Sequence, residues 1–265
     1  MLFPPLTQQS AKPRGSPCHH LKLAGMSVLE RLTASEVNSH RLAGVNAQQL
    51  GPFMVLASGR NTPLDSAWFD GSRVPTEAEL RQLAGFCREH EQPVTIHALS
   101  HVAPALIPVL RQQGYTVSYV LHVYAHDLKH LPERSDFSIR SEPDPEVWAQ
   151  LSAQGFGVDA LEVMRLVARH PRVQRLVAER DGQAVASAAF QVSAAVGALY
   201  GTSTRPGYRG QGAQTALLIH RLHLAREQGA ALASVFVTPG TPSERNIQKA
   251  GFQLAGMRLT FTRQA

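Results

Sequence analysis

Four residues between Tyr200 and Gln214 have the types and spacing of a phosphate-binding loop, namely Gly207, Arg209, Gly210 and Gly212. Glycine has no Cβ, so closely spaced glycines let neighbouring backbone N–H groups turn toward one point. A helix that begins there adds the positive end of its dipole. The stretch therefore predicts a site for phosphate.

The loop lies between a strand and a helix in the expected order of elements. Gly197–Thr204 has the pattern of a strand, and apolar residues at helical spacing follow from Ala213 to a stop at Gly229. Neither G-x-x-x-x-G-K-[ST] nor G-x-G-x-x-G occurs, which excludes the two commonest nucleotide-binding loops. A glycine-rich turn before an ordinary helix is the plainer alternative.

The second half of the chain reads as an alternation of strands and helices. Asp181-Gly182 marks a hairpin turn, Asp144 with Pro145 opens a helix, and Thr241 with Glu244 forms a capping box. The expected strands are Phe137–Arg140, Val173–Glu179, Gln183–Val192, Gly197–Thr204, Ala233–Thr238, Phe252–Ala255 and Met257–Arg263, and the expected helices run from Asp144 to Gln154, Asp159 to His170, Ala213 to Gly229, and Thr241 to Gly251.

The first half repeats part of this pattern. A strand, a helix, a Gly-aromatic pair and a strand occur over Val94–His126 and again over Ala233–Arg263. The other predicted elements are a helix over Val28–Ala34, a strand over Phe53–Ala57, a loop over 58–75, a helix from the capping box Thr76/Glu79 to His90, a helix from Ser100 to Gln113, a strand over Tyr119–His126, and a linker over Leu128–Asp136.

Charge and cysteine content narrow the function classes. The 265 residues carry a net charge of +6, and residues 1–25 hold three basic and no acidic residues, which leaves +3 for the remainder. This modest balance fits a phosphate-rich ligand as well as nucleic acid, so net charge alone does not choose between them. A nucleic-acid-binding protein is kept as an alternative, although the lysines and arginines look dispersed along the sequence. Two cysteines, Cys18 and Cys87, fit a reducing, cytoplasmic compartment, and no apolar run could span a membrane.

The run Arg209–Gln214 fits R-x-x-G-x-[G/A] except at its last residue, and with Pro206 it resembles the acyl-CoA pyrophosphate loop of the GNAT acetyltransferases. The order of elements over the last half of the chain is similar to that family as well. The resemblance implies an α/β mixed-sheet GNAT fold at 137–265, and the internal repeat predicts a degenerate GNAT-like domain at 27–130. The proline-rich residues 1–26 are expected to form a disordered tail.

In this family the loop holds the acyl-CoA pyrophosphate, and the pantetheine arm lies along the preceding strand. The resemblance thus implies acetyl-CoA as cosubstrate. It assigns cofactor contacts to Thr202, Ser203, Thr204, Arg209, Gly210, Gln211, Gly212, Ala213, Gln214, Ser243 and Asn246. Ser243 and Asn246 belong to an S-x-R-N…GF pattern that ends at Gly251-Phe252, and polarity of a capping turn is their alternative reading.

Two departures from the family leave the proton transfers without an assigned residue. Ile247 stands where many members carry a tyrosine that acts as general acid for the leaving thiolate. The strand before the loop also lacks the glutamate that is usual there. The candidates in reach are Tyr200, Tyr208 and Ser243, then Glu244, Asp159 and Glu162.

The sequence predicts transfer of acetyl from acetyl-CoA to an amine by direct attack, with the acceptor unspecified. The alternative is a catalytically inactive acyl-CoA sensor or structural module. A metal site is not expected, because His122, His126 and His130 recur on a predicted strand and linker rather than on a helix.

Overall fold

The computed structural model describes residues 25–43, 46–58, 62 and 64–263. Its strands form one mixed sheet whose order is β1-β2-β3-β4-β11-β5-β10-β9-β8-β7-β6. The strands are β1 (Asn46–Leu50), β2 (Phe53–Ala57), β3 (Ser66–Phe69), β4 (Thr95–Leu99), β5 (Tyr115–His126), β6 (Ser138–Ser141), β7 (Gln174–Arg180), β8 (Gln183–Ser193), β9 (Val196–Thr204), β10 (Leu232–Val237) and β11 (Gln253–Arg263). Nearly all of the expected tail lies outside the described residues.

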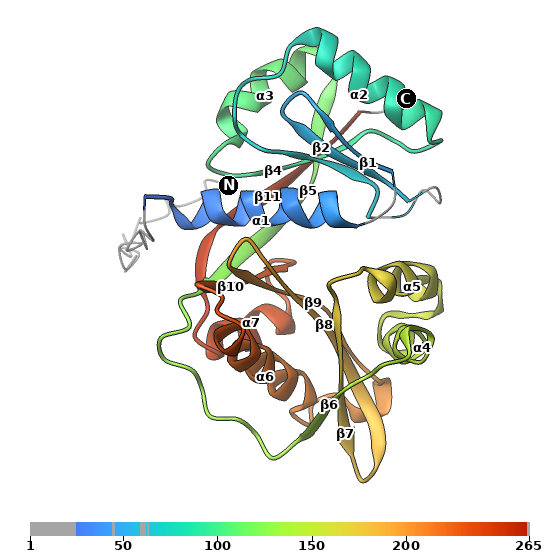
Figure 1. Cartoon of the computed structure of the whole chain (residues 1–265), viewed down its shortest axis with the longest axis vertical. Helices are drawn as coiled ribbons and strands as arrows, with labels where there is room; N and C mark the ends of the chain where they lie inside the picture. Colours follow the sequence, from blue (N-terminus) through green and yellow to red (C-terminus); the bar gives the residue numbers. More distant parts are fainter. Residues whose placement is uncertain (1–24, 44–45, 59–61, 63, 264–265) are drawn as a thin grey trace, which may run out of the picture.

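Helices pack on the sheet in both halves of the molecule, and α1 crosses the junction between them (Figure 1). The helices are α1 (Val28–Leu42), α2 (Glu77–Glu89), α3 (Ala103–Gln112), α4 (Pro145–Phe156), η1 (Val158–Ala160), α5 (Leu161–Arg169), η2 (Pro206–Tyr208), α6 (Ala213–Glu227) and α7 (Pro242–Lys249). None of the helices in the described part of the chain is long and apolar enough to cross a bilayer.

The two halves exchange strands at the middle of the sheet. β4-α3-β5 and β10-α7-β11 are the two copies of the sequence repeat, and β5 and β11 pair antiparallel with each other. The last strand, β11, also pairs with β4, whereas β5 also pairs with β10. Each half therefore completes the sheet of the other. The boundaries 27–130 and 137–265 stay a prediction, and the halves do not form separate sheets.

Several predicted elements differ from the structure. The first helix continues past Ala34 to Leu42, and the expected loop 58–75 contains the short buried strand β3. The two expected final strands are one strand with a bulge between Leu254 and Gly256. Four buried residues such as those of β3 are too few to show a period, which explains why this strand escapes sequence analysis.

The starts of three helices differ in detail from the capping that the sequence suggests. Ser100 does not cap α3, because its Oγ accepts from the N–H of Met257 on β11. Asp159 lies in η1, and α5 starts without a side-chain cap. Thr241 does cap α7, but the carboxylate of Glu244 accepts from the N–H of Gly240 instead of that of Thr241.

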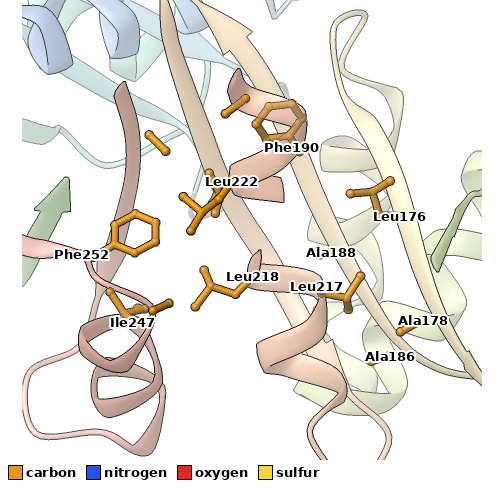
Figure 2. Close-up of a cluster of buried hydrophobic side chains, with 14 of the residues drawn as sticks. Leu176, Ala178, Ala186, Ala188, Phe190, Leu217, Leu218, Leu222, Ile247 and Phe252 are labelled. Carbon is orange, nitrogen blue, oxygen red and sulfur yellow. The ribbon is translucent and has the colours of Figure 1, made fainter. Parts of the chain in front are cut away.

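The core of the second half positions α6 against the sheet. Leu217 and Leu222 on α6 are fully buried with Phe190 of β8, and Ile247 of α7 and Phe252 extend the same cluster (Figure 2). These contacts fix the start of α6 at the end of β9. Ile247, which stands at the position where many GNAT members carry a tyrosine, is a buried core residue.

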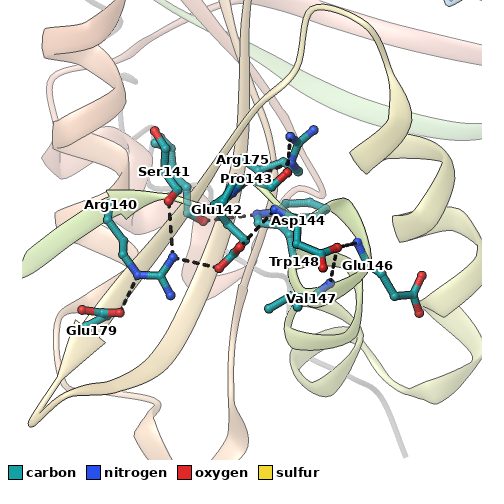
Figure 3. A network of polar contacts seen from close by, with 11 residues as sticks. Arg140, Ser141, Glu142, Pro143, Asp144, Glu146, Val147, Trp148, Arg175 and Glu179 are labelled. Atoms are coloured by element: carbon teal, nitrogen blue, oxygen red, sulfur yellow. Dashed lines mark hydrogen bonds and ion pairs between the residues drawn. The ribbon is translucent and has the colours of Figure 1, made fainter.

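A polar network holds α4 to the edge of the sheet. Arg140 donates to Glu142 and Glu179, and Asp144 caps α4 by accepting from two backbone N–H groups (Figure 3). Trp148 on α4 is fully buried and its Nε1–H donates to the carbonyl of Leu176. The network thus fixes α4 beside β9.

Candidate functional site

The loop between β9 and α6 has the backbone conformation that its glycines permit. Gly210 has φ +76° and Gly212 has φ +90°, which are left-handed conformations that favour glycine. Gly212 is the N-cap of α6 and supplies no side-chain hydrogen bond. The start of α6 is therefore left open.

Six consecutive backbone N–H groups in this loop are available to a ligand. Within the described part of the chain, those from Gly210 to Thr215 donate to no backbone or side-chain acceptor. Free N–H groups at the positive end of a helix suit an anion. Gly210 and Gly212 are exposed, so a ligand would approach them from solvent.

Arg209 fixes the loop to the neighbouring elements. Its Nη2 donates to the carbonyl of Gly155 at the end of α4 at 2.8 Å, and its Nε donates to the carbonyl of Thr204 at 3.4 Å. Gln211 accepts from Arg180 at 2.8 Å. Arginines thus surround the loop, and Arg209 both positions it and brings positive charge.

Gln214, the residue that departs from the family pattern, joins the loop to α7. Its Nε2 donates to Oγ of Ser243 at 3.1 Å, and its Oε1 accepts from Nδ2 of Asn246 at 2.9 Å. The structure therefore brings together three of the residues to which cofactor contacts were assigned. The Ser243 hydroxyl keeps its own proton to donate.

Next to the loop, β9 and β10 part from each other. Their parallel pairing ends at Ala198 and Ser234, although β9 continues to Thr204 and β10 to Val237. The backbone of β9 beyond Ala198 thus has a free edge on this side. Such an edge accepts an extended ligand in the manner of an added strand.

A bulge in β9 lies along this free edge. The register with β8 shifts between Ser187 and Ala189, opposite Gly201 and Thr202, and Gly201 has φ +59°. A Cβ on Gly201 would lie 3.4 Å from Cη2 of Trp148. Bulges commonly re-aim backbone groups beside active sites, and this one follows Tyr200 directly.

A buried arginine on α6 holds the bulge. Arg221 donates to the carbonyls of Ala189 and Tyr200 and to Oγ1 of Thr202, the last at 2.7 Å. No carboxylate neutralises it in the described part of the chain, and burial lowers the pKa of its guanidinium to about 9. Arg221 therefore places positive charge behind the free edge of β9.

The side chains of Ser203 and Thr204 are not directed to a common point. Oγ of Ser203 is buried and donates to the carbonyl of Ser152 on α4, and Thr204 contributes its carbonyl to Arg209. Of the hydroxyls of Thr202, Ser203 and Thr204, that of Ser203 is thus turned into the protein, whereas that of Thr202 accepts from Arg221 and keeps its own proton to donate. The assignment of cofactor contacts to them stays a prediction.

A cavity of about 510 Å³ opens beside the parting strands. Tyr200 and Leu199 of β9, and Val235 and Phe236 of β10, are among its lining residues. Burial raises the pKa of the Tyr200 hydroxyl above its ordinary value, so the hydroxyl stays protonated at neutral pH. Of the three first candidates for proton transfer, Tyr200 alone lines this cavity.

The other candidates have different surroundings. Tyr208 donates to Gln183 near the β7–β8 turn, and Glu244 contacts His122 and Tyr124 of β5 on the side of α7. Asp159 is exposed in η1. Glu162 pairs with Arg165.

Sequence reasoning missed two charged residues that line the cavity. Glu36 is on α1 and Arg258 is on β11, so both come from outside the segment that carries the loop motif. No short motif marks either residue. The one sequence signal that could have pointed to Glu36 is a longer first helix, but the predicted helix ends at Ala34.

The described residues contain no group of three His, Cys, Asp or Glu side chains arranged to hold a metal ion. His126, one of the histidines at four-residue spacing, makes contacts within the protein. Its Nδ1 accepts from the N–H of Leu128, and its ring packs on Phe252.

Comparisons with known proteins bear on the family and the fold. The acetyltransferase (GNAT) family matches residues 125–252. A search of curated proteins found no match.

Solved structures share the fold over most of the chain. A GCN5-related N-acetyltransferase from Kribbella flavida aligns with a TM-score of 0.72 at 18% identity, over 90% of this chain and 96% of that one. A putative GNAT acetyltransferase from Novosphingobium aromaticivorans gives 0.58 at 14%, over 89% and 97%. A tandem GNAT protein from the clavulanic acid biosynthesis pathway gives 0.56 at 16%, over 79% and 77%.

These likenesses in fold extend across both halves, and one of these structures is a tandem GNAT protein. The chain has a mixed α/β GNAT fold, and residues 125–252 belong to the GNAT acetyltransferase family.

Proposed function

We propose that this protein transfers an acetyl group from acetyl-CoA to an amine. The observation that carries the proposal is the continuity of three features: the open amino end of α6, the free edge of β9 and the cavity at Tyr200. A long cosubstrate with a phosphate at one end and a reactive group at the other matches that arrangement.

The loop residues fit the pyrophosphate. The N–H groups of Gly210 to Gln214 would bind its oxygens, and Arg209 adds charge while it keeps the loop against α4. Ser243 and Asn246, joined through Gln214, border the same opening. The pantetheine arm would bond to the backbone of Gly201–Thr204, which directs the thioester toward Tyr200.

Direct attack by the amine suits the surroundings of the cavity. Cys87, the one cysteine in the described part of the chain, is buried among the apolar residues of the first half and is not among the residues that line the cavity. Catalysis would rest on positioning and on backbone N–H groups at the bulge that stabilise the developing oxyanion.

Calorimetry of acetyl-CoA binding tests the loop with a matched pair of glycine substitutions. Gly212 and Gly229 flank the two ends of α6, and both have positive φ, +90° and +74°. We expect Gly212→Val to lose at least two hydrogen bonds to charged oxygens, at about 1.5 kcal/mol each, or roughly 100-fold in affinity. Gly229→Val carries similar backbone strain and should keep the affinity. Equal affinity in all three proteins would contradict the site.

Release of CoA thiol with a panel of amines separates an enzyme from an acyl-CoA sensor. The sensor is favoured by the buried Ile247, which leaves α7 without an acidic side chain at that position. We expect thiol release that depends on the added amine. Tight acetyl-CoA binding with no turnover across the panel would support the sensor instead.

A further inference from the structure

The cavity beside Tyr200 lies between the two halves and is shared by them. Residues of α1, β2, β3, β4 and β11 form one part of its wall, and residues of α5, β8, β9 and β10 form the other. Trp68 of β3 and Phe236 of β10 stack with 6.1 Å between their ring centroids, which makes part of the wall apolar. The rest of the wall carries polar groups whose bonding is incomplete.

Glu36 is the acidic group among the lining residues. Its carboxylate makes no hydrogen bond or ion pair with another described residue. Burial raises its pKa to about 7, although the charge of Arg258 opposes this shift. It also acts electrostatically on Tyr200, so the carboxylate lies near the parting strands. A carboxylate with this pKa can take a proton near neutral pH.

Arg258 and Gln191 are the other polar groups with missing partners. Both Nε of Arg258 and Oε1 of Gln191 are buried. Within the described residues, the Arg258 Nε–H donates no hydrogen bond and the Gln191 Oε1 accepts none. The guanidinium of Arg258 lies 5.7 Å from the ring centroid of Phe236. Gln191 is held in place because its Nε2 donates to Oγ of Ser39 at 2.5 Å. Unsatisfied buried polar atoms are rare and call for a ligand or water.

The histidines in the wall are already bonded and contribute no charge at neutral pH. His40 contacts Ser66, His97 contacts Thr260, and His170 contacts a backbone carbonyl of α1. Burial lowers the pKa of all three, that of His40 to about 4. The charges that a ligand meets are therefore Glu36, Arg258 and, exposed on α5, Arg169.

We propose that the cavity binds the acceptor as a zwitterion, a small molecule that carries a primary amine, a carboxylate and an apolar side chain. The proposal rests on the proposed function, because it names the acceptor of the same reaction. Glu36 and Oε1 of Gln191 bind the ammonium, Arg258 binds the carboxylate, and Trp68 with Phe236 packs on the apolar side chain. The size of the cavity is ordinary for such a ligand with part of a cosubstrate.

In this arrangement Glu36 is the base. It takes one proton from the ammonium, and the neutral amine nitrogen attacks the thioester carbon. A C–N bond forms and the C–S bond breaks. The second N–H proton leaves with the thiolate sulfur, so that the products are an amide and the CoA thiol. Tyr200, which stays protonated, is placed to donate a hydrogen bond at the same point.

A set of matched acceptors tests the carboxylate contact. Phenylalanine, phenylalaninamide and phenethylamine share an amine and a ring but differ in the carboxylate. We expect kcat/KM for phenylalanine to exceed that for the other two by at least about tenfold, since a charge-assisted contact is worth about 1.5 kcal/mol or more. Arg258→Gln should remove this preference, and Arg258→Lys should restore part of it. Arg172→Gln, at an exposed arginine that is not among the lining residues, is the control and should keep the preference.

Glu36→Gln tests the base. We expect it to lower kcat more than it raises KM, and to remove the rise of the rate between about pH 6 and pH 8 that the wild type should show. Acetyl-CoA affinity by calorimetry should stay unchanged, which also reports that the variant is folded. Binding of phenylalanine, measured as a rise in Tm, gives a readout that is independent of turnover.

The failures of the two proposals are distinct. If wild type does not bind acetyl-CoA, the proposed function fails. If it binds acetyl-CoA but acetylates phenethylamine as well as phenylalanine, only the zwitterion proposal is overturned. The same holds if Arg258→Gln leaves the ratio unchanged, or if phenylalanine causes neither a rise in Tm nor thiol release.

Discussion

The amino ends of α2 and α6 differ in a way that separates the two halves. Each helix follows a strand that pairs parallel to the next one, β3 with β4 and β9 with β10. At α2 the hydroxyl of Thr76 accepts from the N–H of Glu79, and the Glu79 carboxylate accepts from the N–H of Thr76 at 2.8 Å. At α6 the N-cap is Gly212, and the N–H groups have no such partner in the described residues.

The first half thus fills the anion position with its own carboxylate. Glu79 also pairs with Arg73, and this pairing lowers the pKa of the Glu79 carboxyl to about 2. The second half leaves the equivalent position open and surrounds it with arginines. If the proposed function holds, similar supersecondary structure serves stability in one half and ligand binding in the other, and the difference lies in a few side chains.

The strands before the two helices differ as well. β9 is nine residues long and has a bulge at Gly201, whereas β3 has four residues and pairs with β2 without a shift of register. The bulge turns the backbone beside Tyr200, and Arg221 holds it there. On β3, Trp68 belongs to a buried cluster and lines the cavity.

The largest effect should follow from removing the bulge. In Gly201→Ala the new Cβ lies 3.3 Å from Cβ of Ala189, and the alanine must adopt a φ of +59°, which is unfavourable for a residue with a side chain. We expect turnover to fall by about 10-fold or more and the free energy of unfolding to fall by about 1–2 kcal/mol. Steady-state kinetics and urea unfolding measure the two effects.

Gly182→Ala is the control for backbone strain alone. Its φ is +74°, and a Cβ there meets no atom within 4 Å. It should lose a similar free energy of unfolding and keep the turnover. Equal loss of turnover in both variants would mean that the bulge has no special role.

A smaller effect is expected from the first half. Thr76→Ala removes the cap of α2 and should lower the free energy of unfolding by about 1 kcal/mol, with acetyl-CoA affinity unchanged. Thr241→Ala removes the same kind of cap from α7, where Ser243 and Asn246 lie. It should lose a similar stability and also weaken acetyl-CoA binding. A change of affinity in Thr76→Ala would remove the distinction between the two halves.

Local chemistry made much of the fold predictable from sequence. The Asp181-Gly182 turn has positive φ at both residues, as its hairpin requires, and the Thr76/Glu79 box caps α2 as expected. The phosphate-type loop was visible because glycine spacing and a strand-helix junction are local features. Its conformation at Gly210 and Gly212 agrees with that expectation.

Contacts between distant segments were not predictable in the same way. The exchange of β5 and β11 depends on pairing across more than a hundred residues, and it also removed the expected cap at Ser100. Glu36 and Arg258 line the same cavity because α1 and β11 both border it. The proposed cofactor loop is therefore predictable from the sequence, whereas the proposed acceptor pocket becomes visible only in the structure.

Hydrogen–deuterium exchange with and without acetyl-CoA tests the central contrast most directly, because it reports on both helix ends in one experiment. We predict that acetyl-CoA slows exchange across residues 209–216, where the N–H groups from Gly210 to Thr215 have no acceptor among the described residues, and leaves residues 73–80 unchanged. Protection at residues 73–80 with none at 209–216 would contradict the account.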